Sequence, residues 1–500
     1  MLQSVKFPSA IYHLATYVFC IILWSIFYFV PSDVQSAQDL SKFQLVYPEV
    51  LIVNDWHKEL SYLGVMKEAI SSGRIPWFVE GLSKIVKGGN AFLGVPIYVA
   101  APHVILLAFL DPFEFHLLNH VACLTIGFWG CVLFQRRWGL SPSAFFFFAV
   151  SFNFYGGFAL KIAAYGPSMM GYYLSIFVIL LLTDIHESKK EKNEAVFSRN
   201  AVWLAICLST VMYLGSLHYF VEWVTFICFW SFFNRSSLIE ITKAGFLTFL
   251  LTAPRLLPAA FNFGSEANSR AVMGYMPSPM FFDSFFEIRL ITEYPAFAWW
   301  EYSNYVGVVG CFALVAFGVY PLLDATSRQE SLVKAMLPAS IILFVISFWK
   351  FKLFVVPHFI PLLNVESLTT RYIFIPVMLL LFYSTINYSK YEKESNFTAR
   401  VFFHLLIALH AVFLGLNLFY WRMDFIHELL EQTPAAAAEY FATLDTAAVQ
   451  LGIQDALVPP AYEWAFLGGI GLAVVGVTAS LYVLLKARTS KQTTETRNLN

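Results

Sequence analysis

The sequence predicts an all-α protein that crosses a membrane many times, and three observations predict it. Of the 500 residues, 58% are hydrophobic and only 13% are charged, so the mean hydropathy is +0.64. Apolar runs as long as a bilayer is thick recur along most of the chain. The 52 Phe, 25 Tyr and 13 Trp suit lipid-facing helices with aromatic belts. The formal net charge of −1 offers no positive field that would recruit nucleic acid, so a nucleic-acid partner is set aside.

Apolar segments follow one another from residue 11 to residue 486, and we count roughly 12 to 14 spans. The first segment, 11–30, lacks a small-residue cleavage site after a short hydrophobic region. We therefore expect a retained helix and not a removed signal peptide. The later segments are 96–110, 115–135, 142–160, 167–183, 200–216, 217–233, 241–262, 303–323, 335–355, 371–387, 401–421 and 463–486.

Lysine and arginine cluster in several short connections, which the positive-inside rule places in the cytoplasm. These residues are Arg136 and Arg137; Lys189, Lys190, Lys192 and Arg199; Arg235 and Lys243; Arg328 and Lys334; Lys390, Lys393 and Arg400; and Lys486, Arg488, Lys491 and Arg497. The same rule puts three long loops and one short loop outside: 31–95, 263–302, 422–462 and 356–370. We expect a single transmembrane domain over 1–487, followed by a polar cytoplasmic tail over 488–500.

Before residue 189, the apolar segments are one more than this topology allows. If the N-terminus is inside and the loop 31–95 is outside, the chain must cross the membrane one time fewer than the number of segments. Either 96–110 or 142–160 is therefore expected to enter the membrane to only half its depth, and the sequence does not choose between them. Residues that could break a helix there are Asn153, Gly156, Gly157 and Pro167.

The first outer loop contains a stretch that predicts an amphipathic helix with an acid at its start. Asn54 can cap a helix that runs to Gly73. Such a helix would lie along the membrane surface. Asp55, in its first turn, could act as a base on a hydroxyl group of a lipid or an extracellular acceptor. The alternative is that Asp55 only complements the helix dipole. The apolar positions at near-helical spacing are Leu60, Leu63, Met66 and Ile70.

Four arginines are candidate clamps for a phosphate group. An arginine at membrane depth is costly unless an anion meets it, and guanidinium binds phosphate through two parallel hydrogen bonds. The candidates are Arg255, Arg270, Arg289 and Arg371. The alternative is pairing with Glu266, Glu287 or Glu293, or snorkelling to lipid headgroups.

Several other polar side chains fall inside apolar segments, where an ionisable group is by default a candidate site. They are Lys161, His218, Tyr219, Glu222, His103 and His120. Each could equally make a contact between helices. The histidines lack the HExxH spacing of zinc sites, and the six cysteines are expected to be small buried hydrophobic residues. No Walker loop, GxGxxG or GxSxG motif is present.

Taken in order, these features resemble the GT-C superfamily of integral membrane glycosyltransferases, and most specifically its bacterial YfhO-type branch. The resemblance covers about residues 1–390, and each motif is weak by itself. The stretches that carry it are Asn54-Asp55-Trp56-His57, Ser72-Gly73-Arg74-Ile75-Pro76-Trp77, Gly94-Val95-Pro96-Ile97-Tyr98, Pro254-Arg255-Leu256-Leu257-Pro258, Ser269-Arg270, Tyr305-Val306-Gly307 and Thr370-Arg371-Tyr372.

The resemblance implies an all-helical fold whose first outer loop packs over a cavity at the membrane surface. It implies an inverting transfer of a monosaccharide from a polyprenyl-phosphate-linked donor to an acceptor hydroxyl group. Asp55 would take the acceptor's proton, and arginines such as Arg255 and Arg270 would stabilise the leaving phosphate. Further substrate contacts are expected from His57, Glu59, His218, Arg289 and Arg371. The first loop lacks the adjacent Asp-Glu pair of better-known relatives, which leaves the need for a divalent metal open.

The expected partners are the lipid-linked sugar donor, the surrounding lipid, and an acceptor that is a glycan, a lipid or a protein. The expected location is a bacterial inner membrane, with the active site facing outward. Two other classes of function stay open. One is a lipid or glycan transporter, which should show matching broken helices in its two halves. The other is a non-catalytic scaffold subunit with the same fold.

Overall fold

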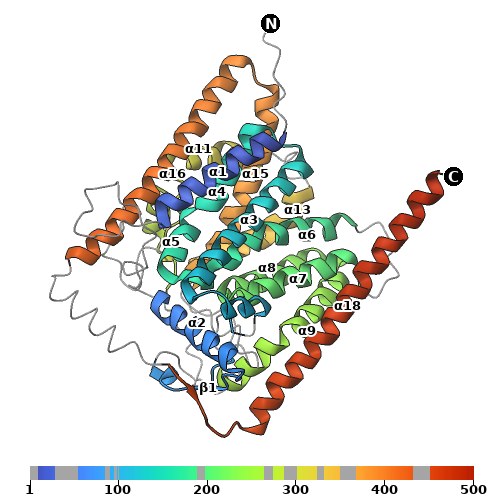
Figure 1. The fold of residues 1–500 in the computed structure, drawn as a ribbon. Coiled ribbons are helices and arrows are strands. Elements are labelled where there is room, and N and C mark those ends of the chain that lie inside the picture. The colour runs from blue at the N-terminus through green and yellow to red at the C-terminus, as the bar shows by residue number, and fades with distance from the viewer. Residues whose placement is uncertain are drawn as a thin grey trace.

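The structure, a computed structural model, is almost entirely helical, which confirms the predicted all-α class (Figure 1). It describes residues 9–28, 55–84, 90–94, 98–99, 101–188, 197–263, 274–286, 301–323, 331–349, 368–431 and 451–499. Two strands of two residues each, β1 (Phe78–Val79) and β2 (Ile453–Gln454), form the one described sheet.

The α-helices are α1 (Ser9–Tyr28), α2 (Asp55–Ser72), α3 (Pro112–Trp138), α4 (Pro142–Phe154), α5 (Gly156–Tyr165), α6 (Ser175–Glu187), α7 (Arg199–Tyr213), α8 (Leu217–Phe233), α9 (Leu238–Phe263), α10 (Ser278–Phe286), α11 (Gly307–Ala313), α12 (Tyr320–Leu323), α13 (Ser331–Ser347), α15 (Phe374–Glu394), α16 (Phe397–Glu431) and α18 (Pro460–Leu499). Short 3-10 helices are η2 (Leu82–Lys84), η3 (Pro102–Ala108), η4 (Gly166–Leu174), η6 (Arg235–Ser237) and η10 (Thr369–Ile373), and η8 (Leu314–Val319) is a π-helix.

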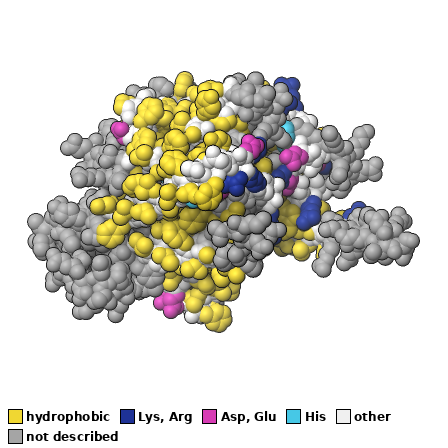
Figure 2. All heavy atoms as spheres, turned by 90° about the horizontal axis from the view of Figure 1, so that it is seen from above, with side chains coloured by type: hydrophobic (Ala, Val, Ile, Leu, Met, Phe, Trp, Pro, Cys, Tyr) yellow, Lys and Arg dark blue, Asp and Glu magenta, His cyan; other side chains and the backbone are white. Residues whose placement is uncertain are grey.

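Six described helical stretches are long and apolar enough to cross a membrane. They are Glu114–Trp138, Ser168–Glu187, Arg235–Ala260, Thr369–Glu394, Phe397–Trp421 and Pro460–Lys486, and a bent pair formed by α4 and α5 would make a seventh. Figure 2 shows hydrophobic side chains over much of one face, with charged side chains confined to small groups. The chain is therefore an integral membrane protein. The larger number of spans stays a prediction, because α1, α8, α11 to α12, and α13 are shorter apolar helices.

Neither of the two segments that were candidates for half-depth entry forms one long straight helix in the described part of the chain. In the predicted segment 96–110, the described helix is η3, which has seven residues. At about 2 Å per residue such a 3-10 helix is roughly 14 Å long, well short of a hydrocarbon core of about 30 Å. The segment 142–160 is also interrupted, because α4 and α5 meet at Tyr155 with a bend of 42°. The break falls among the residues predicted to disrupt a helix.

At one end of the bundle, which we call the ribbon end, the first and the last of the predicted outer loops meet. β1 and β2 pair antiparallel and so join the first of these loops to the last. Beside them, Arg74 forms an ion pair with Asp455. A backbone bridge from Gly274 to Leu368 joins the two remaining loops. In Figure 1, α2, β1 and the start of α18 lie together at the bottom. Each of these contacts brings two of the predicted outer loops together, and the side of the membrane on which they lie stays a prediction.

At the opposite end, which we call the basic end, two of the basic connections are packed together. Gly139 ends α3 in the left-handed conformation, with φ 60°. Its carbonyl accepts a hydrogen bond from Lys393 Nζ at 2.5 Å, and the Ser141 N–H donates to Ser389 Oγ at 2.8 Å. The connection after α3 is thereby fixed on the last turns of α15. The turn from α15 to α16 lies at the top of Figure 1.

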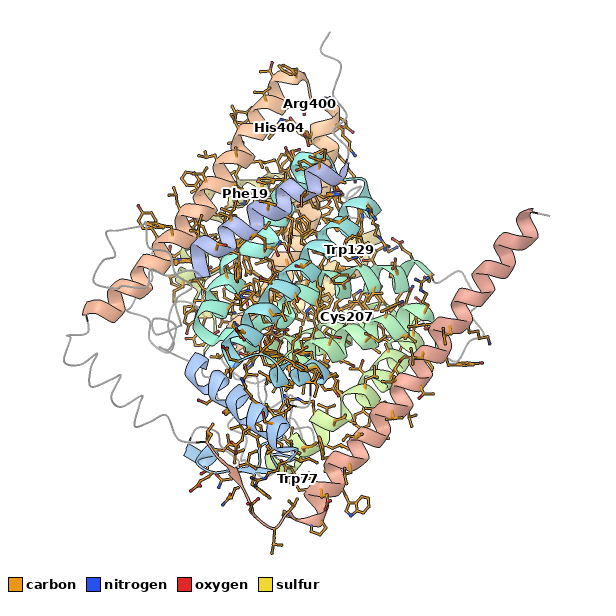
Figure 3. The ribbon with its side chains drawn as sticks, in the orientation of Figure 1. Phe19, Trp77, Trp129, Cys207, Arg400 and His404 are labelled. Carbon is orange, nitrogen blue, oxygen red and sulfur yellow. The ribbon has the colours of Figure 1, made fainter. Side chains whose placement is uncertain are left out.

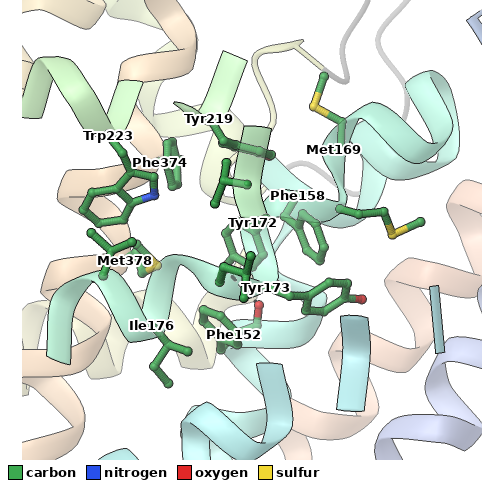
Figure 4. Close-up of a cluster of buried hydrophobic side chains, with 14 of the residues drawn as sticks. Phe152, Phe158, Met169, Tyr172, Tyr173, Ile176, Tyr219, Trp223, Phe374 and Met378 are labelled. Atoms are coloured by element: carbon green, nitrogen blue, oxygen red, sulfur yellow. Dashed lines mark hydrogen bonds between the residues drawn. The ribbon is translucent and has the colours of Figure 1, made fainter. Parts of the chain in front are cut away.

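Aromatic side chains from η4, α8 and the start of α15 fill the centre of the bundle (Figure 4). The rings of Tyr219 and Phe374 meet edge to face with centroids 4.9 Å apart. Trp223 donates from Nε1 to Ser175 Oγ at 3.0 Å. This packing fixes α8 against the helix that follows η10. Of the six free cysteines, Cys20, Cys123, Cys131 and Cys207 are buried as expected, Cys311 is half-buried, and Cys228 is exposed because it faces outward from α8.

Candidate functional site

Three charged side chains from distant parts of the chain lie together in the interior. Arg371, in η10, donates from Nε to Oε2 of Glu301 at 2.9 Å, and one of its Nη groups donates to Oε1 of the same carboxylate. Lys161, on α5, places its Nζ 3.9 Å from that Oε2. Arg371, Glu301 and Lys161 are 5%, 2% and 3% exposed. We call these three residues the charge cluster. Its paired, charge-assisted geometry offsets part of the cost of burying ions.

The break between α4 and α5 brings Lys161 to Glu301. At the break, the Gly156 N–H donates to the carbonyl of Tyr305 at 2.9 Å. A Cβ atom on Gly156 would lie 2.6 Å from the backbone nitrogen of Tyr305, so only glycine allows this approach. The segment that follows Glu301 is therefore fixed against the first turn of α5, and Lys161 follows on the next turns.

A hydrogen-bonded shell surrounds the segment after Glu301. The Tyr155 hydroxyl donates to Oδ1 of Asn304. Asn304 Nδ2 in turn donates to the Tyr302 carbonyl at 2.9 Å and to Ser284 Oγ at 3.2 Å. Burial, and then the neighbouring Glu301 carboxylate, raises the pKa of Tyr302 to about 12. Tyr302 is therefore protonated at neutral pH, and the shell links α10 to the charge cluster without adding a charge.

Helix α8 adds two buried polar side chains next to the charge cluster. Tyr219 is 2% exposed and Glu222 is fully buried. Tyr219 lies within electrostatic range of Arg371, Glu301 and Glu222. Its hydroxyl has no hydrogen-bond partner among the described residues. A buried hydroxyl without a partner costs about 1–3 kcal/mol, so Tyr219 is well suited to bond a ligand that enters this site.

The helix that carries the predicted base packs beside these residues. α2 begins at Asp55, directly after the predicted cap, and ends before Gly73, whose φ is +64°. It contacts α5 and η4. Glu59 is 3% exposed, and its Oε2 accepts the N–H of Ser168 at 3.1 Å. Glu59 thus fastens α2 to the start of η4. The side chains of Asp55 and His57 lie outside the described residues.

Arg255 is the second predicted arginine that the structure describes, and its partners differ from those of the charge cluster. It is 2% exposed on α9, and its Nη1 donates to the carbonyl of Val99 at 2.7 Å. Its Nε has no hydrogen-bond partner within the described ranges. His218 is half-buried in the first turn of α8. Arg270 and Arg289 lie outside the described residues.

The sequence does not reveal Glu301 as the partner of Arg371, nor Tyr155 and Asn304 as members of the site. Glu301 and Arg371 are 70 positions apart, and no local pattern links them. The one available signal is an acid in the aromatic run Trp299-Trp300-Glu301-Tyr302, because a lone carboxylate near the membrane is costly. Its partner could have been any of the four arginines.

Within the part of the chain that the structure describes, no group of three His, Cys, Asp or Glu side chains could hold a metal ion. The resemblance to GT-C enzymes rests on sequence motifs. Comparison with protein-family models, with curated proteins and with solved structures finds no match for this chain.

Proposed function

We propose that this protein is a membrane glycosyltransferase of the GT-C type. It moves a monosaccharide from a polyprenyl-phosphate-linked donor to an acceptor hydroxyl group, with inversion, at the outer face of a bacterial inner membrane. Asp55 is the general base. The observation that carries the proposal is the packing of α2, which starts at Asp55, against α5, which carries Lys161 of the charge cluster.

The proposed step needs a base on one side of the sugar and positive charge on the other. The acceptor oxygen bonds to the anomeric carbon as the bond from that carbon to the phosphate oxygen breaks. The polyprenyl phosphate leaves with the electron pair, and the acceptor's proton passes to the Asp55 carboxylate. Arg371 and Lys161 stabilise the charge that develops on the phosphate.

Within this proposal, the other buried polar groups have supporting tasks. Glu301 is a positioning residue, because its two oxygens hold one edge of the Arg371 guanidinium in a fixed plane. The Tyr219 hydroxyl donates to the donor phosphate or to the sugar. Arg255, buried on α9 with an Nε that has no described partner, is a further candidate contact for the donor.

A transfer assay with the purified full-length chain in nanodiscs tests the assignment of the base. The donors are a panel of polyprenyl-phosphate monosaccharides, the acceptors are envelope glycans and lipids, and the signal is released polyprenyl phosphate. Asp55→Asn is expected to lower release by about 100-fold or more, because the amide cannot accept a proton. Glu68→Gln is the matched control, since Glu68 is an exposed acid on the same helix.

Two results would contradict the proposal. Wild-type turnover by Asp55→Asn would remove Asp55 from the role of base. Failure of the wild-type chain to consume any donor in the panel, with every acceptor present, would reject sugar transfer from this class of donor.

One observation favours the alternative of a lipid or glycan transporter. The 42° break between α4 and α5 is a feature of transporter helices, although transporters usually carry a matching break in their other half. Reconstitution in liposomes with a fluorescent lipid-linked sugar separates the two functions. Exposure of the sugar on the opposite leaflet without release of polyprenyl phosphate supports transport, and release without exposure supports transfer.

A further inference from the structure

A groove of about 430 Å³ runs between α3, α6 and α7, on a different part of the molecule from the charge cluster. Most of its wall is apolar. It opens to the outside of the bundle, since Ile126 and Trp203 in its wall are each 42% exposed. Figure 3 labels Cys207, on the α7 side. The lining residues used below are Ile126, Arg137, Asp184, Trp203, Ile206 and Cys207.

The length of the groove matches one leaflet of a bilayer. Ile126 and Arg137 mark its extent on α3 and are 11 positions apart in the sequence. At 1.5 Å per residue this distance is about 16 Å. Half of a hydrocarbon core of about 30 Å is nearly the same. A single acyl chain that enters at one end would therefore fill the groove along its length.

Charges of both signs stand at the end of the groove that belongs to the basic end. Arg137 forms ion pairs with Asp184 and with Glu187, the latter at 2.9 Å. The carboxylate side chains keep 39% and 50% of their surface exposed. The Arg136 guanidinium lies over the Trp129 ring at 5.6 Å, and no described acid pairs with it. Arg136 is exposed one position before Arg137 on α3, so a cation with no described counter-ion lies on the same helix turn as Arg137, the partner of the two exposed carboxylates.

We propose that this groove binds one acyl chain of a zwitterionic aminophospholipid, such as phosphatidylethanolamine. The lipid phosphate meets Arg136, and the primary ammonium donates hydrogen bonds to Asp184 and Glu187. An anionic headgroup would instead face two carboxylates. A choline headgroup has no N–H to donate. The positive-inside rule assigns the lipid to the cytoplasmic leaflet. This site is independent of the proposed sugar transfer.

Native mass spectrometry of the full-length chain tests the site after release from nanodiscs that contain equal amounts of phosphatidylethanolamine, phosphatidylglycerol and phosphatidylcholine. The wild-type chain is expected to retain phosphatidylethanolamine about tenfold over the other two, a difference of about 1.4 kcal/mol. Ile206→Trp fills the groove from α7 and should lower this retention about tenfold. Phe246→Trp is the matched control, because Phe246 is 57% exposed on α9, outside the lining of the groove.

Surface variants test the headgroup contacts without filling the groove. Arg136→Gln with Glu187→Gln is expected to keep a bound lipid but to lose the preference for phosphatidylethanolamine. Equal retention by Ile206→Trp and the wild-type chain would overturn the site. A wild-type preference for phosphatidylglycerol, or equal retention of all three lipids, would overturn the assignment of the headgroup. If Ile206→Trp fails to fold, the headgroup preference of the wild-type chain and its loss in the surface variants are sufficient to test the proposed lipid site.

Discussion

At the scale of single residues, the pairing of Arg371 with Glu301 makes a prediction about stability that is separate from activity. Removing Glu301 takes away the carboxylate that Arg371 and Lys161 both face, and the loss of one partner of a buried ion pair typically costs about 3–5 kcal/mol. Glu301→Ala should therefore strongly lower the stability of the protein in detergent. The double variant Arg371→Ala with Glu301→Ala should recover part of the loss, because two buried like charges no longer face each other. Thermal unfolding measures both.

The same pair of variants separates a structural role from a catalytic one. If Arg371 holds the donor phosphate, the double variant regains stability but not sugar transfer. Recovery of both would make the charge cluster purely structural. Equal stability of Glu301→Ala and the wild-type chain would contradict the burial argument itself.

His103 makes a prediction about pH. Its ring stacks on Phe115 with centroids 5.5 Å apart, and its Nε2 has no described hydrogen-bond partner. Burial lowers the pKa of His103 below its ordinary value. The folded chain therefore binds fewer protons here than the unfolded chain, so stability is complete above the unfolded pKa and is lost as the pH falls below it. The loss is at most about 1.4 kcal/mol per pH unit below pH 6.5.

His103→Phe should make the dependence shallower, because the ring still stacks but cannot be protonated. Unfolding temperatures of the wild-type and variant chains from pH 7.5 to pH 5.0 measure the difference. Both chains contain the other histidines, so the contribution of these residues cancels in the comparison. Parallel curves would show that burial of His103 does not disfavour its charged form.

At the scale of elements, α18 depends on glycine to lie along α9. A Cβ atom on Gly469 would lie 2.8 Å from the Ala253 carbonyl oxygen and 2.8 Å from Pro254 Cα. These are backbone atoms of a helix and cannot move aside. Gly469→Ala is therefore expected to push α18 away and to cost about 1–3 kcal/mol, the usual cost of overpacking.

Gly471→Ala is the matched control for this contact. It lies on the same helix, and a Cβ atom there would meet nothing within 4 Å. It should leave the unfolding temperature unchanged or raise it slightly, since alanine favours helix more than glycine does. A similar effect of both substitutions would mean that α18 adjusts to the added methyl group.

At the scale of the whole molecule, the two ends of the bundle make a prediction about topology. Asn396 is exposed in the turn between α15 and α16 at the basic end, and Leu457 is 99% exposed at the ribbon end. The positive-inside rule puts the first in the cytoplasm and the second outside. In a Cys228→Ser background, Leu457→Cys should react with an impermeant maleimide in intact cells. Asn396→Cys should react only after lysis, and the reverse pattern would invert the topology.

The sequence by itself determined the membrane class, the helical fold, the bounds of α8 and the helix that starts at Asp55. These follow from composition, apolar length and capping signals, all of which act over a few neighbouring residues. The sides on which the loops lie stay a prediction from the positive-inside rule.

Only the tertiary structure decided which polar groups meet. Arg371 was predicted as a cation that needs an anion. The fold places the Glu301 carboxylate beside it and brings Lys161, a second cation, to the same carboxylate from another distant segment. The fold also made η3 the segment too short to span the membrane and placed the break at Tyr155. The physical reason is that a buried charge must have a partner, but helix packing, and not sequence distance, determines which partner is within reach.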